Sequence, residues 1–188
     1  YNTTYIVNLS KIIKDLNEKF KIDQKEAELK EGTLQYTYRS AIEQMITISH
    51  NYAAFMLLGK VSNSEVNFFI KSLGLSKSEM SSPPKTTPED IGIFYEKLYR
   101  GEIVNLQYSN QMMDVLKRQK INDRIPKDLP EGVAVAHKTG ELPNIRNDAG
   151  IVFSKGGDYI IVILTEGKSV DELTEKIAQI SKVVYEYF

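Results

Sequence analysis

The amino-acid sequence predicts an α+β fold, in which helices pack on an antiparallel sheet. Three observations favour this class: apolar residues recur at helical spacing up to about Leu116, three β-branched runs then follow at short intervals, and an amphipathic segment ends the chain. Strands that follow one another without intervening helices pair most readily as antiparallel neighbours. The late strands are therefore expected to form one sheet that the helices cover.

The first helices are predicted from apolar residues that lie three and four positions apart. One helix is expected from about Tyr5 to Phe20, where the polar residues 2–4 supply N-cap side chains. A second is expected over Tyr38–Ile48 and a third over Tyr52–Leu58. The helical pattern breaks between them at Ser49-His50-Asn51, and Ser49 taken alone is interpreted as the N-cap of the third helix.

Capping residues and prolines delimit the following helices. A helix after Ser62 is expected to turn four apolar side chains inward, namely Val66, Phe69, Ile70 and Leu73. The stretch Leu75–Lys85 has no regular pattern and is expected to be a loop. Thr87 and Pro88 mark the start of the next helix, whose predicted core face consists of Ile91, Phe94, Tyr95 and Leu98. Ser109 is expected to cap a shorter helix that ends near Leu116.

The chain changes character after Lys120. Three β-branched runs predict strands at Val133–His137, Ala149–Phe153 and Tyr159–Leu164, and the glycines between the last two predict an antiparallel hairpin. Ser169 is expected to cap a C-terminal helix whose buried face consists of Leu173, Ile177, Ile180 and Val184. No repeat or linker divides the chain, so residues 1–188 are expected to form a single domain.

Composition excludes several classes of function. The formal net charge is −1 with mixed signs, so no basic surface for nucleic acid or for an anionic membrane is expected. The chain has no cysteine and only two histidines, His50 and His137, which argues against a metal centre, and no cofactor is expected. No apolar stretch is long enough for a transmembrane segment, and the sequence shows no signal peptide.

Two short motifs carry the chemistry. Ser49-His50-Asn51 lies at a helix break, and Lys138-Thr139-Gly140, followed by Glu141, is predicted to end the first strand. The sequence Lys-[Ser/Thr]-Gly occurs often by chance, so by itself it is a weak indication of function. Ser-x-Asn by itself gives no indication of function. Their order along the chain and their positions at a helix break and a strand end strengthen the combination.

Together the motifs make the chain resemble the class A β-lactamase and penicillin-recognising serine hydrolase family, which is defined by Ser-x-x-Lys, Ser-Asp-Asn and Lys-[Thr/Ser]-Gly. Ser49-His50-Asn51 resembles the second motif and Lys138-Thr139-Gly140 matches the third. The resemblance covers about Ile22 to the C-terminus. It implies the β-lactamase/transpeptidase-like fold, an extracytoplasmic location, and a small-molecule β-lactam or a peptidoglycan peptide as the ligand.

The resemblance also implies two catalytic residues. Ser49 resembles the hydroxyl that passes a proton to the leaving nitrogen of the substrate. Lys138 would place a positive charge beside that hydroxyl and beside the substrate carboxylate.

Five further residues are expected to bind substrate. Asn51 resembles the amide that holds the catalytic lysine and the substrate's own amide, whereas Arg124 and Thr139 would bind the substrate carboxylate. The backbone N–H of Glu141 would donate to the oxyanion, and Gly140 completes the expected set. An alternative for Arg124, a surface ion pair with Asp123 or Asp128, stays open.

The nucleophile that the family needs is not found in the sequence. Only Ser82 has a lysine three residues later, Lys85, and the two prolines between them predict an extended loop, so this pair is rejected. Counting back along the chain places the family's Ser-x-x-Lys within the first seven residues. One register puts Tyr1 and Thr4 in the two positions and another puts Thr4 and Val7 there, and neither supplies the pair.

Further departures bear on turnover. His50 replaces the aspartate of the second motif, and Glu79 is the only acid in the Leu75–Lys85 loop, which lacks the Glu-x-x-x-Asn pattern that positions the deacylating water in class A enzymes. Acylation without release of the acyl group is therefore an alternative to hydrolysis.

The two strands that the family carries before its first helix are also missing, so the chain is interpreted as N-terminally truncated or as having a decayed site. A complete chain would have to rearrange or pair the exposed sheet edge.

Three interpretations of function stay open. The first is a serine hydrolase that transfers the acyl group of a β-lactam or of a D-Ala-D-Ala-type amide. The second is a catalytically inactive homologue that binds a cell-wall peptide or a protein partner on the same fold. The third is an unrelated helical interaction domain in which the motifs arise by chance. Arg146 and Asp148 are interpreted as a structural pair with no part in the chemistry.

Overall fold

The computed structural model describes residues 4–6, 29 and 35–188 of the chain. These divide into two compact units, one made of Tyr1–Met45 and Ser49–Ser62 and the other of Ile46–Ile48 and Asn63–Phe188. None of the helices in the described ranges is long and apolar enough to cross a lipid bilayer.

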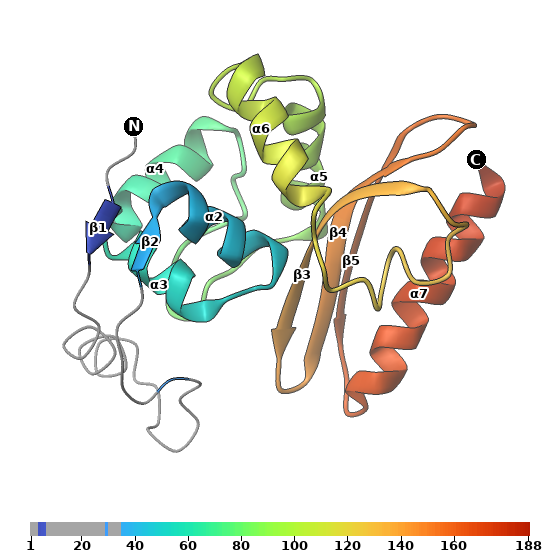
Figure 1. Ribbon diagram of the computed structural model, residues 1–188. Helices are drawn as coiled ribbons and strands as arrows, with labels where there is room; N and C mark the ends of the chain where they lie inside the picture. Colours follow the sequence, from blue (N-terminus) through green and yellow to red (C-terminus); the bar gives the residue numbers. More distant parts are fainter. Residues whose placement is uncertain (1–3, 7–28, 30–34) are drawn as a thin grey trace. The chain divides into compact units, whose positions relative to one another are not determined.

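In the first unit a short antiparallel ladder precedes the helices (Figure 1). β1 (Thr4–Ile6) pairs with β2 (Gln35–Thr37), and α2 (Tyr38–Thr47) follows β2 directly. Thr37 caps α2, because the backbone N–H of Ser40 donates to its Oγ1 at 3.1 Å. α3 (Asn51–Leu58) then buries Tyr52, whose hydroxyl donates to the carbonyl of Leu29 at 3.0 Å.

Two predictions for this unit are wrong. The helix predicted from Tyr5 does not begin there, since Thr4, Tyr5 and Ile6 lie in β1, where pairing with β2 satisfies their backbone groups; the rest of that prediction lies outside the described residues. The N-cap of α3 is His50 rather than Ser49, because the N–H of Ala53 donates to His50 Nδ1 at 3.2 Å. Ser49 has φ 54°, whereas a capping residue needs an extended backbone.

The second unit contains an antiparallel sheet in the order β3-β4-β5. Its strands are β3 (Ala134–Leu142), β4 (Ile145–Phe153) and β5 (Tyr159–Glu166), and the predicted hairpin between the last two is confirmed. β3 runs beyond its predicted end at His137, so Lys138-Thr139-Gly140 lies inside the strand and not at its end. The extra length comes from backbone pairing with β4, which polar side chains do not reveal in a sequence.

Helices cover both faces of this sheet (Figure 1). α5 (Pro88–Tyr99) and α6 (Leu106–Leu116) lie on one face and α7 (Val170–Tyr187) lies on the other. The first face is closed by an apolar core of Tyr95, Leu98, Ile103, Leu116, Ala136, Ala149 and Ile151. The second is closed by Ile125, Val135, Val152, Tyr159, Ile161 and Ile177. Successive residues of one strand therefore pack on opposite faces of the sheet, as Val135 and Ala136 do. The helix-on-sheet architecture that the sequence predicts is confirmed.

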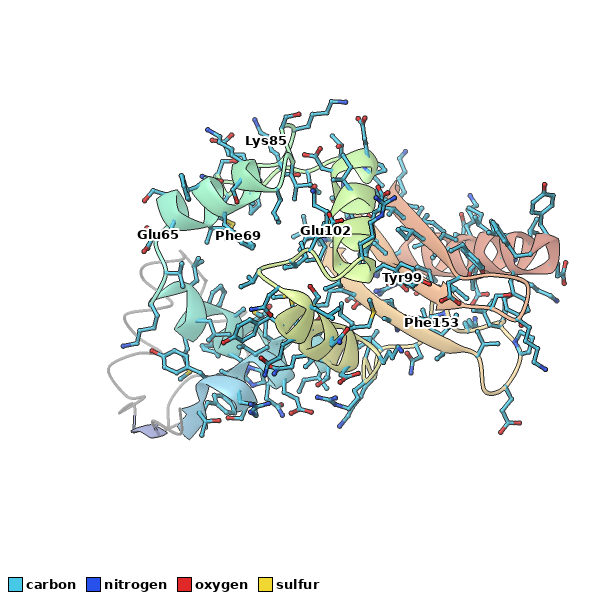
Figure 2. All side chains as sticks on the ribbon, turned by 90° about the horizontal axis from the view of Figure 1, so that it is seen from above. Glu65, Phe69, Lys85, Tyr99, Glu102 and Phe153 are labelled. Carbon is cyan, nitrogen blue, oxygen red and sulfur yellow. The ribbon has the colours of Figure 1, made fainter. Side chains whose placement is uncertain are left out.

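Phe153, at the end of β4, packs against the first of these cores. The ammonium group of Lys117 lies 3.9 Å from the centroid of its ring. Figure 2 shows Phe153 and Tyr99 on the side of the sheet that α5 covers. The Tyr99 hydroxyl donates to Asp158 Oδ2 at 2.9 Å, which ties the end of α5 to the turn between β4 and β5.

Several predicted details of the helices are corrected. No residue of α4 (Asn63–Ser72) is buried, and the Phe69 side chain, which the sequence predicts to face inward, is 40% exposed. Leu73, which lies just past the helix and is also predicted to face inward, packs against a core. α6 begins at Leu106 with Asn105 as its N-cap, so Ser109 is an internal residue. Ile180 on α7 is exposed, because the helix buries a narrower face than its apolar residues suggest.

Hydrogen bonds from two helices hold the predicted loop Leu75–Lys85. The Asn67 side chain of α4 accepts from the N–H of Met80 at 2.6 Å and donates to its carbonyl at 3.2 Å. The buried Asp90 carboxylate of α5 accepts from the N–H of Lys77 at 2.8 Å and from the Ser78 hydroxyl at 2.7 Å. The loop therefore has a defined conformation although its sequence shows no periodicity.

The close approach of β4 to β3 gives a testable prediction at Gly150. A Cβ added there would lie 2.4 Å from the Ala136 carbonyl oxygen and 2.6 Å from the Cβ of His137. We expect Gly150→Ala to lower the free energy of unfolding by about 3 kcal/mol, measured by urea denaturation. Gly92→Ala is the control, because nothing lies within 4 Å of a Cβ at this helical position. It should be neutral or stabilising by up to about 1 kcal/mol. Equal effects of the two substitutions would contradict the steric explanation.

Candidate active site

The predicted site residues fall in both compact units. Ser49 and Asn51 belong to the first unit, and the other five residues belong to the second, namely Arg124, Lys138, Thr139, Gly140 and Glu141. The five lie on β3 and on the loop that leads to it from α6. The second unit brings these five together, whereas their meeting with Ser49 and Asn51 stays a prediction.

Ser49 occupies an unusual backbone conformation between α2 and α3. Its φ of 54° lies in the left-handed region, which costs a non-glycine residue about 1–2 kcal/mol. Asn51 is the first residue of α3 and its side chain is exposed. His50, which replaces the motif's aspartate, has a structural function as the cap of α3. Backbone strain of this kind is concentrated at functional sites, because a structure retains it where a side chain must be held in one place.

Arg124 is buried, with an exposed fraction of 1%. Its Nη2 donates a hydrogen bond to the Glu141 carboxylate, and its Nε lies 3.6 Å from Asp123 Oδ1. The alternative of an ion pair with Asp123 is therefore correct in its partner, but the Arg124 side chain is buried and does not lie on the surface. A buried guanidinium is strongly disfavoured without compensating charge, so these two carboxylates stabilise Arg124 in place.

A hydrogen-bond network that sequence reasoning missed fixes the Arg124 loop to the sheet. His137 Nδ1 donates to the Asp148 carboxylate at 2.9 Å, and His137 Nε2 lies 3.0 Å from Asn122 Oδ1. The same carboxylate accepts from the N–H of Ile125 at 3.1 Å. Asn122, two residues before Arg124, and Ile125, directly after it, are thus both held. The predicted pairing of Arg146 with Asp148 is wrong, since the Arg146 Nη1 donates to the carbonyls of Leu142 and Ile145.

α7 holds the same loop from its other side. The buried Ser181 hydroxyl donates to the carbonyl of Ile125 at 2.8 Å, so both backbone polar groups of Ile125 are bonded to side chains. The Ile125 side chain is itself fully buried in the core between the sheet and α7. The backbone next to Arg124 consequently has little freedom to move.

Several donors near Arg124 lack a partner. Within the described part of the chain, Arg124 Nε and Nη1 and Thr139 Oγ1 are buried and make no hydrogen bond. Thr139 lies two residues before Glu141 on β3, so the two side chains share a face of the strand. Buried polar atoms are almost always hydrogen-bonded, and each exception calls for an explanation. An anionic ligand that accepts from these atoms would supply one.

Lys138 points to the opposite face of β3 from Thr139 and lies in register with Ala149. Its Nζ donates to the carbonyl of Thr139 at 2.6 Å. Burial lowers the pKa of the Lys138 ammonium group, and the nearby Arg124 lowers it further, against the opposing effect of the Asp148 and Glu141 carboxylates. Beneath it, the Tyr95 hydroxyl donates to the carbonyl of Ala149 at 2.8 Å and anchors this part of the sheet.

Among the described residues, none comes so close to Gly140 that a larger side chain would be excluded. A Cβ at this position would make an ordinary contact of 3.6 Å with the Asn147 Cβ, and its φ lies outside the left-handed region. β3 pairs with β4 alone among the described strands of this sheet, so its other side is available for backbone contacts. A glycine there is consistent with close approach of a ligand to the strand.

The described residues contain no group of three or more acidic or histidine side chains that could hold a metal ion.

The Asp148 carboxylate gives a prediction for stability. Asp148→Asn would replace one accepting oxygen by an NH2 group facing the donors of His137 and Ile125. Because Asp148 is fully buried, we expect a loss of about 3 kcal/mol in the free energy of unfolding, measured by chemical denaturation. Asp114→Asn, at an exposed position of α6, is the matched control and should change stability by less than about 0.5 kcal/mol. A similar loss in both variants would show that the buried network does not hold the loop.

The ion pair of Glu141 gives a prediction for pH dependence. The hydrogen bond from Arg124 holds the pKa of the Glu141 carboxyl below its usual value of 4.5. The pair therefore stabilises the folded state above that pH and loses its effect as the pH falls through the lowered pKa. We expect wild type to exceed Glu141→Gln in the free energy of unfolding at neutral pH. The difference should vanish in strong acid, and a difference that does not depend on pH would refute the assignment.

Comparisons with known proteins bear on the family of the chain and on its fold. The model of a family described as the "Beta-lactamase enzyme family" matches residues 8–188. The solved structure of PBP-A is 28% identical, with a TM-score of 0.78 over 84% of this chain and 63% of PBP-A. A beta-lactamase from Sphaerobacter thermophilus is 25% identical, with a TM-score of 0.79 over 84% of this chain and 65% of that protein. No curated protein matches the chain.

A third structure extends the likeness in fold. TLA-3 extended-spectrum beta-lactamase is 22% identical, with a TM-score of 0.81 over 99% of this chain and 75% of TLA-3. The chain spans less than two thirds of the length of PBP-A and of the Sphaerobacter enzyme. The match of the family model over nearly the whole sequence, together with the α+β fold, shows that the chain belongs to the beta-lactamase enzyme family.

Proposed function

We propose that the protein acts in acyl transfer from a β-lactam or a D-Ala-D-Ala-type amide, as a serine hydrolase related to the β-lactamases. The observation that carries this proposal is the group of buried atoms without a hydrogen-bond partner in the described residues, Arg124 Nε and Nη1 and the Thr139 hydroxyl. A β-lactam and the end of a D-Ala-D-Ala peptide both carry a carboxylate, which a guanidinium and a hydroxyl bind well.

The hydroxyl that forms the acyl bond as the amide bond breaks is not among the residues that the motifs assign, and the acylation experiment below is designed to identify it. The other parts of the chemistry would divide among the remaining residues. Ser49 would pass a proton to the leaving nitrogen, and Lys138, with its lowered pKa, would exchange protons more readily than an ordinary lysine. Asn51 would hold the substrate amide, Gly140 would allow close approach, and the N–H of Glu141 would donate to the oxyanion. A variant of PBP-A, 28% identical to this chain, is described as an acyl-enzyme complex with penicillin G, which supports acylation as the first step.

A second candidate is a catalytically inactive homologue that binds a cell-wall peptide or a protein partner. The absence of Ser-x-x-Lys from this sequence favours it. The loop after α4 also favours it, because Glu79, its only acid, is held in a backbone bridge with Lys85 and is not followed by the asparagine of class A enzymes. Either candidate would act outside the cytoplasm, where peptidoglycan and β-lactams are met.

The deciding experiment is intact-protein mass spectrometry after incubation with penicillin G. We expect a mass increase of one penicillin, and peptide mapping would identify the acylated residue. Ser49→Ala should slow acylation by roughly two orders of magnitude if Ser49 transfers the proton. Ser76→Ala is the matched control, since Ser76 is exposed and lies in the loop after α4. It should acylate at the wild-type rate.

The opposite result would be equally informative. If folded protein forms no adduct, the acyl-transfer proposal fails for this chain. Binding of an acetylated D-Ala-D-Ala peptide without any adduct would then support the inactive homologue.

A further inference from the structure

The side chain of Glu141 makes a contact that the proposed role of its backbone N–H does not explain. Its carboxylate accepts a hydrogen bond from Arg124 Nη2, and Arg146 faces it across the strand pair. The Arg124 side chain is 1% exposed, whereas the Glu141 side chain is 48% exposed. The pair thus joins a buried cation to a carboxylate at the protein surface.

Glu141 accepts from Nη2, the Arg124 nitrogen that takes part in both forked contacts with a carboxylate. A guanidinium binds a carboxylate through two parallel N–H groups, either from both Nη atoms or from Nε together with Nη2. Nη2 belongs to both arrangements. Arg124 Nε and Nη1 have no hydrogen-bond partner within the described ranges, although Nε lies 3.6 Å from Asp123 Oδ1. A ligand carboxylate that forms a fork must share Nη2 with Glu141, so the two carboxylates would be neighbours.

We propose that the Glu141 carboxylate competes with a ligand carboxylate for Arg124 and thereby sets how tightly the protein binds anionic ligands. In the free protein Glu141 holds Nη2. A ligand carboxylate that makes a two-point contact must either displace Glu141 or bind beside it against the repulsion of a like charge, with the Thr139 hydroxyl as a further donor. The identity of the natural ligand rests on the proposed function, whereas the competition rests only on Arg124 and Glu141.

The competition predicts a selective effect of charge. A ligand with a carboxylate must either break the Arg124–Glu141 hydrogen bond or lie close to the Glu141 charge, whereas a neutral ligand of the same shape meets neither cost. Replacing Glu141 by glutamine removes the competing charge but keeps the size and one accepting oxygen. Hydrogen bonds to charged groups are worth enough that this change should strengthen carboxylate binding roughly tenfold.

The test uses two simple probes, benzoate and its neutral counterpart benzamide, titrated into the full chain and followed by NMR. We expect Glu141→Gln to bind benzoate roughly tenfold more tightly than wild type, with benzamide unchanged. Glu141→Asp should give an intermediate gain, because its shorter side chain keeps the charge but reaches Arg124 less well, and it serves if the glutamine variant does not fold. Glu175→Gln is the matched control, since it breaks the exposed ion pair with Lys127. It should bind both probes as wild type does.

Two outcomes would overturn the inference: equal benzoate affinity in wild type and in both Glu141 variants, or no benzoate binding to any folded Glu141 variant. An acetylated D-Ala-D-Ala peptide and its C-terminal amide separate this inference from the proposed function. If benzoate shows the expected gain while neither peptide binds, the competition at Arg124 stands and the proposed ligand class is wrong. If the acid binds more tightly to Glu141→Gln and the amide does not, both are supported.

Discussion

The buried contact between His137 and Asp148 is the interaction on which the arrangement of the second unit depends. A carboxylate with no solvent exposure must be satisfied by donors from the protein, and Asp148 obtains them from His137 of β3 and from the backbone of Ile125. One side chain of β4 thereby ties together a strand and the loop that carries Arg124. Ser181 of α7 completes the attachment from the other layer, so the loop is held between the sheet and the helix.

This attachment explains how the fold retains a group that is unfavourable by itself. Arg124 is buried with two nitrogens that no described residue satisfies, and the Thr139 hydroxyl is left in the same condition. Such groups persist only where the surrounding structure fixes them, and the cores on the two sheet faces supply that support. The pair with Glu141 reduces the penalty of the buried charge in the absence of a ligand. In the proposed competition, Glu141 therefore raises the stability of the folded protein and lowers its affinity for an anionic ligand.

The loop between α4 and α5 shows a different balance. Asn67 and Asp90 hold its backbone with hydrogen bonds of normal length, and neither contributes a group to the proposed chemistry. The loop is consequently a fixed structural element whose one acidic side chain, Glu79, lies in a backbone bridge. The hydrogen bonds that order the loop come from Asn67 and Asp90 and not from Glu79.

The sequence by itself determined the fold class, the order of helices and strands in the second unit, and the two motifs. These follow from local signals: apolar spacing, capping residues such as Thr87 and Ser169, and β-branched runs. Only the tertiary structure decided the rest. The extension of β3 past His137 required the partner strand. The loop that carries Arg124 is fixed through Ile125 to α7 and to the sheet, and the Asp148 network joins residues far apart in the chain. Contacts of this kind depend on which faces meet in space, and a sequence pattern records only which residues are neighbours along one helix or strand.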